Sequence, residues 1–131
     1  MEDRNETSRG GKTMKIGIQV MVPPYTYEDL DTAIKIAEAA MEKGHEVTLF
    51  LFADSVICTN KNIKPIKIDR NIPQKLVELM QKGNFEVHIC GICMDYRGIT
   101  TDMIIEGSKP SGLPELANLI ATCDRFINLM A

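Results

Sequence analysis

The sequence predicts a single-domain α/β protein, a three-layer α/β/α sandwich around a mostly parallel sheet of about five strands. Three observations favour this class. Short apolar runs are rich in β-branched side chains, as in strands that are buried on both faces. Patterns with apolar residues three and four positions apart, typical of amphipathic helices, separate those runs. The chain has 131 residues, which is the length of one domain rather than two.

Strand-like segments recur along the chain. We expect strands at 14–22, 47–52, 85–90 and 125–130, with a further short strand near 106–110. The first segment, MKIGIQVMV, is apolar almost throughout and ends at Pro23 and Pro24. With the helix and strand that follow, it forms a βαβ unit, and such a unit requires a parallel strand pair. The loop after it, PPYTYED, contains no glycine and is not a nucleotide-binding fingerprint.

Helical patterns fill the gaps between these strands. Thr26 is expected to cap the first helix, which has an apolar stripe over 30–41 and ends at Gly44. A second helix is predicted over 72–81. Ser111 is expected to cap the last helix, in which one face is formed by Leu113, Leu116, Ala117 and Ile120. The segment 54–69 is less regular, and 101–107 reads either as a helical turn or as a strand.

Composition excludes several classes of protein. The net charge is −3, which disfavours nucleic-acid binding by an overall basic field. No apolar run approaches the ~18 residues that cross a bilayer, so we expect no membrane association. Residues 1–13 are polar and lack the apolar core of a signal peptide, and we interpret them as a flexible tail before a domain at 14–131. Four cysteines without a secretory signal indicate a reducing, cytoplasmic location.

The most informative segment is a cysteine pair, Cys90-Gly-Ile-Cys93, at the predicted end of the third strand. In open α/β sheets, chemistry gathers at the carboxyl ends of the strands. A thiol there, at the start of a helix, can have a lowered pKa and act as a nucleophile. Arg97 is expected to add positive charge to this site, and Gly91 to leave room for the sulfur of a partner.

Three interpretations of the pair remain open from spacing alone. The cysteines are core residues, or zinc ligands, or reactive thiols that transfer persulfide sulfur or exchange disulfides. For Cys58 and Cys123 we favour a packing role. Zinc would need further ligands such as His88 or His45, and the usual second cysteine pair is missing, so we expect no metal.

The order of several segments resembles the DsrE family, including its TusD-like sulfurtransferase subunits. The similarity covers about 14–131 and includes Gly44-His45-Glu46, the strand and turn VTLFLFADSV, a cysteine eight residues before Gly98 of the Arg97-Gly98 pair, and the ending ELANLIATCDRFINLM. In that family the active cysteine lies eight residues before this glycine, and Cys90 matches that position. The resemblance therefore implies that Cys90 accepts sulfane sulfur as a persulfide and passes it to the thiol of a partner.

Further properties are implied by the same resemblance. It predicts no cofactor, sulfur-relay partners such as TusA-like or rhodanese-like carriers, and assembly as a homo-oligomer (trimer or hexamer) or hetero-oligomer. Cys93 lies where some members also have cysteine, so it either resolves the Cys90 persulfide or forms a disulfide with Cys90. The alternatives are a thiol–disulfide redox protein and a DsrE-fold scaffold or binding subunit with inert cysteines.

Four other side chains have weaker assignments. Tyr25 and Tyr27 follow the first strand and are expected at the same edge as Cys90, either in its pocket or on the loop surface. His88 is interpreted as a sheet-face residue with a satisfied ring rather than a catalytic base. His45 is expected at a turn between helix and strand.

Overall fold

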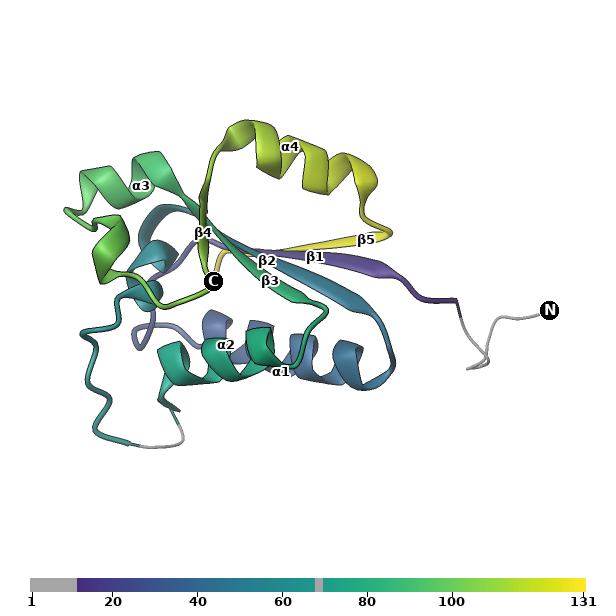
Figure 1. Cartoon of the computed structure of the whole chain (residues 1–131), viewed down its shortest axis with the longest axis horizontal. Coiled ribbons are helices and arrows are strands. Elements are labelled where there is room, and N and C mark those ends of the chain that lie inside the picture. Colours follow the sequence, from purple (N-terminus) through teal and green to yellow (C-terminus); the bar gives the residue numbers. More distant parts are fainter. Residues whose placement is uncertain (1–11, 68–69) are drawn as a thin grey trace.

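Five parallel strands form the centre of the molecule. The computed structural model describes residues 12–67 and 70–131 (Figure 1). One sheet has the order β4-β3-β2-β1-β5, and each neighbouring pair is parallel. The strands are β1 (Lys15–Val20), β2 (Glu46–Leu51), β3 (Phe85–Cys90), β4 (Lys109–Ser111) and β5 (Arg125–Leu129). The predicted fold class is confirmed.

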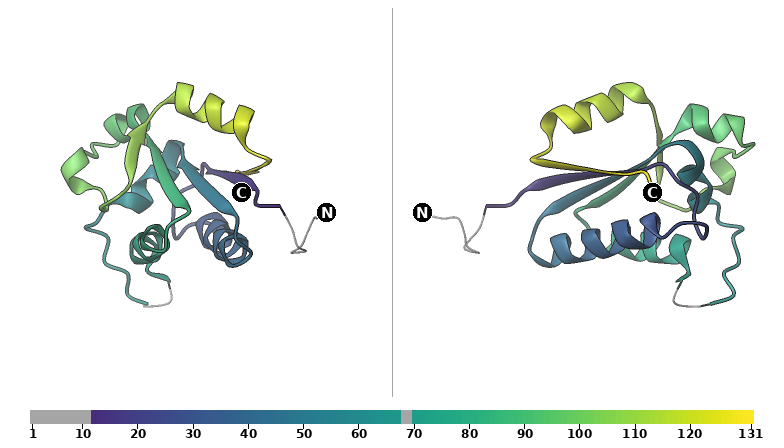
Figure 2. Two further views of the ribbon diagram at one scale, coloured as in Figure 1. Left: turned by 45° about the vertical axis from the view of Figure 1, so that its right-hand side comes forward. Right: turned by 180° about the vertical axis from the view of Figure 1, so that it is seen from behind.

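Helices cover both faces of this sheet. They are α1 (Asp29–Glu42), α2 (Ile72–Gln81), α3 (Gly91–Tyr96) and α4 (Leu113–Thr122), with short 3-10 helices η1 (Ala53–Thr59) and η3 (Thr101–Met103). The α1 and α2 helices lie side by side on one face, and α3 and α4 lie on the other (Figures 1 and 2). The result is the expected three-layer arrangement.

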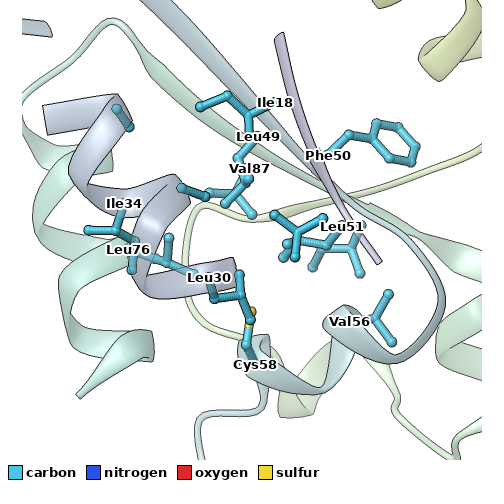
Figure 3. Packing of buried hydrophobic residues seen from close by; sticks show 14 of the residues in the cluster. Ile18, Leu30, Ile34, Leu49, Phe50, Leu51, Val56, Cys58, Leu76 and Val87 are labelled. Carbon is cyan, nitrogen blue, oxygen red and sulfur yellow. The ribbon is translucent and has the colours of Figure 1, made fainter. Parts of the chain in front are cut away.

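The main core lies between the sheet and the α1–α2 layer (Figure 3). Ile18, Leu49 and Val87 occupy adjacent positions on β1, β2 and β3, since Ile18 pairs with Leu49 and Leu49 with Val87. Leu30 of α1 and Leu76 of α2 belong to the same cluster, and all five side chains are buried. Burial of such a side chain contributes about 1.5–3 kcal/mol, so the β-branched runs and the helical stripes together account for the layer.

The start of the first helix differs from the prediction. The N-cap of α1 is Glu28, not Thr26. Pro24 forms an isolated bridge with Tyr27, and this tight turn occupies Thr26. The turn therefore extends further along the chain than the capping pattern indicates.

The cap of the last helix also differs from the prediction. Ser111 is the final residue of β4, and Gly112 is the N-cap of α4. The backbone N–H of Gly112 donates to Glu115 Oε1 at 2.8 Å. A carboxylate in the first turn therefore satisfies the backbone donor, which is one half of a capping box.

The predicted apolar face of α4 is only partly correct. Leu116 and Leu119 are buried, whereas Leu113 and Ile120 are 59% and 48% exposed, and Ala117 is also exposed. Only one side of the helix meets the sheet, so its remaining apolar residues face outward. Periodicity identified the helix but not which apolar residues it buries.

The remaining predictions concern the irregular segments and the N-terminal tail. Residues 53–59, which overlap the stretch 54–69 expected to be irregular, form η1, while residues 68–69 lie outside the described part. Residues 101–103 form a 3-10 turn, as in the helical interpretation of 101–107, and the fourth strand occupies 109–111 rather than 106–110. The expected flexible tail lies outside the described residues, except for its last two positions.

Candidate functional site

The cysteine pair lies at the carboxyl edge of the sheet. Cys90 is the last residue of β3 and the N-cap of α3, and Cys93 lies in the first turn of that helix. Their exposed fractions are 4% and 8%. The neighbouring parallel strand β2 ends at the same edge, so η1, which follows β2, packs against α3.

Cys93 has a backbone donor at its sulfur and the other cysteine as a neighbour. The backbone N–H of Ala53 donates to Cys93 Sγ at 3.2 Å. Burial raises the pKa of the Cys93 thiol, interaction with the neighbouring Cys90 thiol raises it further, and the Ala53 N–H opposes both. The Cys93 thiol is therefore protonated at neutral pH.

The backbone that supplies this donor has an uncommon conformation. Ala53 has φ = +56°, in the left-handed region that non-glycine residues rarely adopt. Ser55 fixes the segment, because its Oγ accepts from Phe52 N–H at 2.9 Å and donates to the Val20 carbonyl at 2.6 Å. Ser55 is fully buried. Ser55 thus attaches the start of η1 to the end of β1, and in this position the Ala53 N–H points at Cys93 Sγ.

Arg97 connects η1 with α3. Its Nε and Nη2 donate to Asp54 Oδ1 at 2.9 and 2.7 Å, and its Nη1 donates to the Cys93 carbonyl at 3.0 Å. Its positive charge also lowers the pKa of the Cys93 thiol, as a minor contribution. The expected proximity of this charge to the cysteine pair is therefore present. The guanidinium, however, donates its hydrogen bonds to Asp54 and to the Cys93 backbone, not to Cys90.

Gly91 follows Cys90 directly as the first residue of α3. A Cβ atom added there would lie 3.5 Å from the Ser111 carbonyl oxygen, an ordinary contact. The strands explain this neighbour, since Cys90 and Ser111 are register partners across β3 and β4. Space for a partner's sulfur at Gly91 stays a prediction.

Tyr25 and Tyr27 lie in a different pocket from the cysteine pair. A hollow of about 710 Å³ is lined by both tyrosines, Asp31, Arg70 and Ala131, among others, and its lining includes neither Cys90 nor Cys93. The Arg70 guanidinium lies over the Tyr25 ring, 5.3 Å from its centroid. Both tyrosines are partly exposed, which favours the loop-surface interpretation over a place in the cysteine pocket.

His88 has partners at both ring nitrogens. Nδ1 lies 2.7 Å from Ser111 Oγ and Nε2 lies 3.0 Å from Glu86 Oε1. The ring stacks on Phe50, with centroids 6.3 Å apart and an interplanar angle of 10°. The satisfied-ring interpretation is confirmed. The hydrogen bond between His88 Nε2 and Glu86 is the main reason why the pKa of Glu86 is lowered.

The other candidate metal ligands and thiols are separate from the pair. His45 Nδ1 accepts from the Met14 N–H at 3.0 Å, which joins the turn after α1 to the start of β1. Cys58 is completely buried and Cys123 is half-buried; both are free thiols. In residues 12–67 and 70–131, no three His, Cys, Asp or Glu side chains form a group that could hold a metal ion.

Sequence reasoning missed the η1 residues that complete the site. Ala53, Asp54 and Ser55 supply the N–H donor, the partner of Arg97 and the anchor to β1, respectively. A usable signal was present, because loops after adjacent parallel strands open at the same edge of a sheet. The segment after residue 52 is therefore a natural neighbour of the segment after residue 90.

Fold and site together define a class of protein. It is a small parallel α/β protein with a buried thiol pair where the third strand meets a short helix. A family model described as the DsrE/DsrF-like family matches residues 14–129. The chain belongs to this family. No described helix is long and apolar enough to cross a membrane.

Individual relatives extend this result. The chain is 31% identical over 126 residues to "Putative sulfurtransferase DsrE" of Allochromatium vinosum, covering 87% of this chain and 97% of that protein. It is 25% identical to "Sulfurtransferase TusD" of an Enterobacter strain, covering 87% and 98%. The crystal structure of the ychN protein from Escherichia coli matches with a TM-score of 0.81 and 31% identity, covering 89% of this chain and all of that one.

Proposed function

We propose that this protein is a sulfur carrier of the sulfurtransferase type, in which Cys90 holds sulfane sulfur as a persulfide and passes it to a partner thiol. The observation that carries the proposal is the position of Cys90: a buried thiol at the carboxyl end of a central strand, with a second buried thiol in the first turn of the helix that follows. Relatives named as sulfurtransferases, matched over most of their length, support the same chemistry.

The chemistry needs two exchange steps. The Cys90 thiolate attacks the terminal sulfur of a donor, the donor leaves as a thiolate, and Cys90 becomes Cys-S-SH. An acceptor thiolate then attacks the outer sulfur, and Cys90 leaves as a thiolate. A pKa near ambient pH serves both steps, because attack favours a basic thiolate and departure favours a weakly basic one.

Access to the thiol determines which donors can react. Cys90 is 4% exposed, so the groups that cover it must move before a large donor can reach it. A small sulfane donor, such as a hydropolysulfide, needs the least displacement. Ile92 and Tyr96 lie one turn apart on α3 and are 64% and 85% exposed. We infer that a sulfur-relay protein docks beside these side chains and, during transfer, displaces the groups that bury Cys90.

Assembly into a homo-oligomer is part of the proposal. The outward apolar side chains of α4, Leu113 and Ile120, offer a contact surface for a second copy. The test is light scattering coupled to gel filtration, which yields a molecular mass independent of shape. Elution at the mass of a monomer, 14.6 kDa, across micromolar concentrations would reject assembly while leaving the chemistry of Cys90 untouched.

The test of the carrier function is intact mass spectrometry after a short incubation with hydropolysulfide. Wild type and Cys123→Ser, the matched control for losing a thiol elsewhere, should gain about 32 Da that a thiol reductant removes. Cys90→Ser should not gain it. Equal labelling of Cys90→Ser and wild type would reject Cys90 as the carrier. Absence of labelling in every variant would favour the scaffold alternative.

A further inference from the structure

The two thiols are placed next to each other where β3 meets α3. Cys90 is the last residue of β3 and the N-cap of α3, and Cys93 lies three positions further on in the first turn of that helix. Both are buried. The Ala53 N–H donates to Cys93 Sγ at 3.2 Å, so the sulfur of Cys93 has a fixed backbone partner. Cys90 is the proposed nucleophile, and Cys93 is a second thiol held beside it.

The pair also has the spacing that a disulfide requires. Cys90 and Cys93 are three positions apart across the first turn of α3, so their side chains lie on the same face. Cys90 has extended backbone angles, φ −62° and ψ 116°, and stands just outside the helix. Both side chains are buried at the same edge of the sheet. A bond between them therefore needs a rotation of side chains rather than unwinding of the helix.

Two groups near Cys93 partly offset the effect of burial on its thiol and would stabilise the thiolate as it attacks. An N–H donor aimed at a thiol stabilises its thiolate, and the guanidinium of Arg97 lies on the same turn. Ala53 adopts the left-handed conformation to aim this N–H, and residues kept in such strained conformations cluster at functional sites. A cysteine that only filled space would not need a preset donor.

We propose that Cys93 is a resolving thiol, which converts the Cys90 persulfide into a Cys90–Cys93 disulfide and releases sulfide. The inference rests on the proposed function of Cys90. Cys93 Sγ attacks Cys90 Sγ, the bond from Cys90 Sγ to the outer sulfur breaks, and the outer sulfur leaves with the electron pair as hydrosulfide. The proton of the Cys93 thiol moves to the leaving sulfur. Two thiol sulfurs are oxidised to the disulfide, and the sulfane sulfur is reduced to sulfide.

This step adds an activity to the carrier. When an acceptor thiol arrives first, the outer sulfur is transferred; when none arrives, the pair releases it as sulfide. A further turnover requires an external dithiol to reduce the disulfide, whereas a single turnover does not. The first turnover therefore isolates the role of Cys93.

The experiment is a single-turnover time course on the full chain. Fully reduced protein receives less than one equivalent of hydropolysulfide, and samples are quenched in acid at intervals, which protonates the thiolates and stops further exchange. Intact mass and dissolved sulfide are then measured. In wild type and in Cys123→Ser, a species about 32 Da heavier should give way to one about 2 Da lighter than the reduced protein, with release of the sulfide. Peptide mapping should locate the new bond between residues 90 and 93.

Cys93→Ser and Cys93→Ala separate this proposal from its alternatives. Both should gain the 32 Da species, form no disulfide, and release sulfide at least ~10-fold more slowly than wild type. Because the wild-type disulfide is read directly, misfolding of either variant does not remove the test. A wild-type persulfide that persists without disulfide, or equal sulfide release from the Cys93 variants, would overturn the resolving role. Absence of the 32 Da species from wild type would instead reject the carrier function.

Discussion

Arg97→Ala should loosen the contact between η1 and α3. The wild-type guanidinium makes two bonds to Asp54 Oδ1, at 2.9 and 2.7 Å, and one to the Cys93 carbonyl at 3.0 Å. The Asp54 side chain is 53% exposed and that of Arg97 is 26% exposed. A pair this open to solvent contributes about 0.5 kcal/mol. The bond to the carbonyl, with one charged partner and partial burial, adds about 1–1.5 kcal/mol.

The expected loss is therefore about 1.5–2 kcal/mol in the free energy of unfolding, most of it from the carbonyl contact. Urea denaturation measures it as a lower midpoint with an unchanged slope. A double-mutant cycle with Asp54→Ala should return a coupling of about 0.5 kcal/mol, which weakens as salt screens the pair. Arg125→Ala is the matched control, since Arg125 donates to the carbonyl of the preceding residue on an exposed strand.

Two outcomes would refute this reasoning. If Arg97→Ala unfolds at the same urea concentration as Arg125→Ala, the contacts do not stabilise the fold. If the coupling with Asp54 equals the whole loss, the ion pair dominates and the carbonyl bond contributes nothing. The same variant should still gain sulfur at Cys90, because Arg97 holds the Cys93 backbone rather than Cys90. A complete loss of labelling in a folded variant would show that its charge acts on Cys90 directly.

Three further predictions concern single sites. Gly17→Ala places a Cβ 3.1 Å from side chains of α4 and β5, and this overpacking should lower the free energy of unfolding in urea by about 1–3 kcal/mol. The same free energy of unfolding in the control Gly91→Ala would contradict this prediction. The hydrogen bond with His88 lowers the pKa of Glu86 below 4.5 in the folded protein, so the stabilisation that the Glu86 carboxylate provides is present above pH 4.5 and is lost as the pH falls through the pKa of the folded state. The urea midpoint of Glu86→Gln should therefore fall less steeply in acid than that of wild type. Equal pH dependence of the two midpoints would contradict this prediction. Burial raises the pKa of Cys58, so iodoacetamide should label it only after unfolding, as read by peptide mass; rapid native labelling would show that the site opens.

Much of the fold could be predicted because each buried strand has a distinctive pattern. The runs at 14–22, 47–52 and 85–90 are apolar enough to lie between two helical layers, and all three form central strands. Helix starts were less predictable, because several polar residues near each start can act as a cap and the tertiary turn selects among them. At α1 the selected residue was Glu28. The outward apolar residues of α4 show a further limit, since periodicity does not show how much of the apolar surface of a helix is buried.

The candidate site was predictable only as far as side chains define it. Cys90 and Cys93 could be placed from a strand that ends in a cysteine pair, and Arg97 from its distance along the chain. The donor to Cys93 could not, because it is a backbone N–H, and every non-proline residue has one. Alanine also has no preference for the left-handed region that Ala53 adopts.

What fixes that donor is the register of the sheet. Leu51 of β2 pairs with Ile89 of β3, so the two chains leave the sheet at the same level. Ala53 is two residues past Leu51, and Cys93 is four residues past Ile89 in a helix that turns back over the same edge. A one-residue slip of this pairing would turn the side chains to opposite faces and would move the N–H away from the sulfur. The reactivity of Cys93 thus depends on strand pairing within the core, which is why substitutions far from either cysteine can alter its chemistry without touching a thiol.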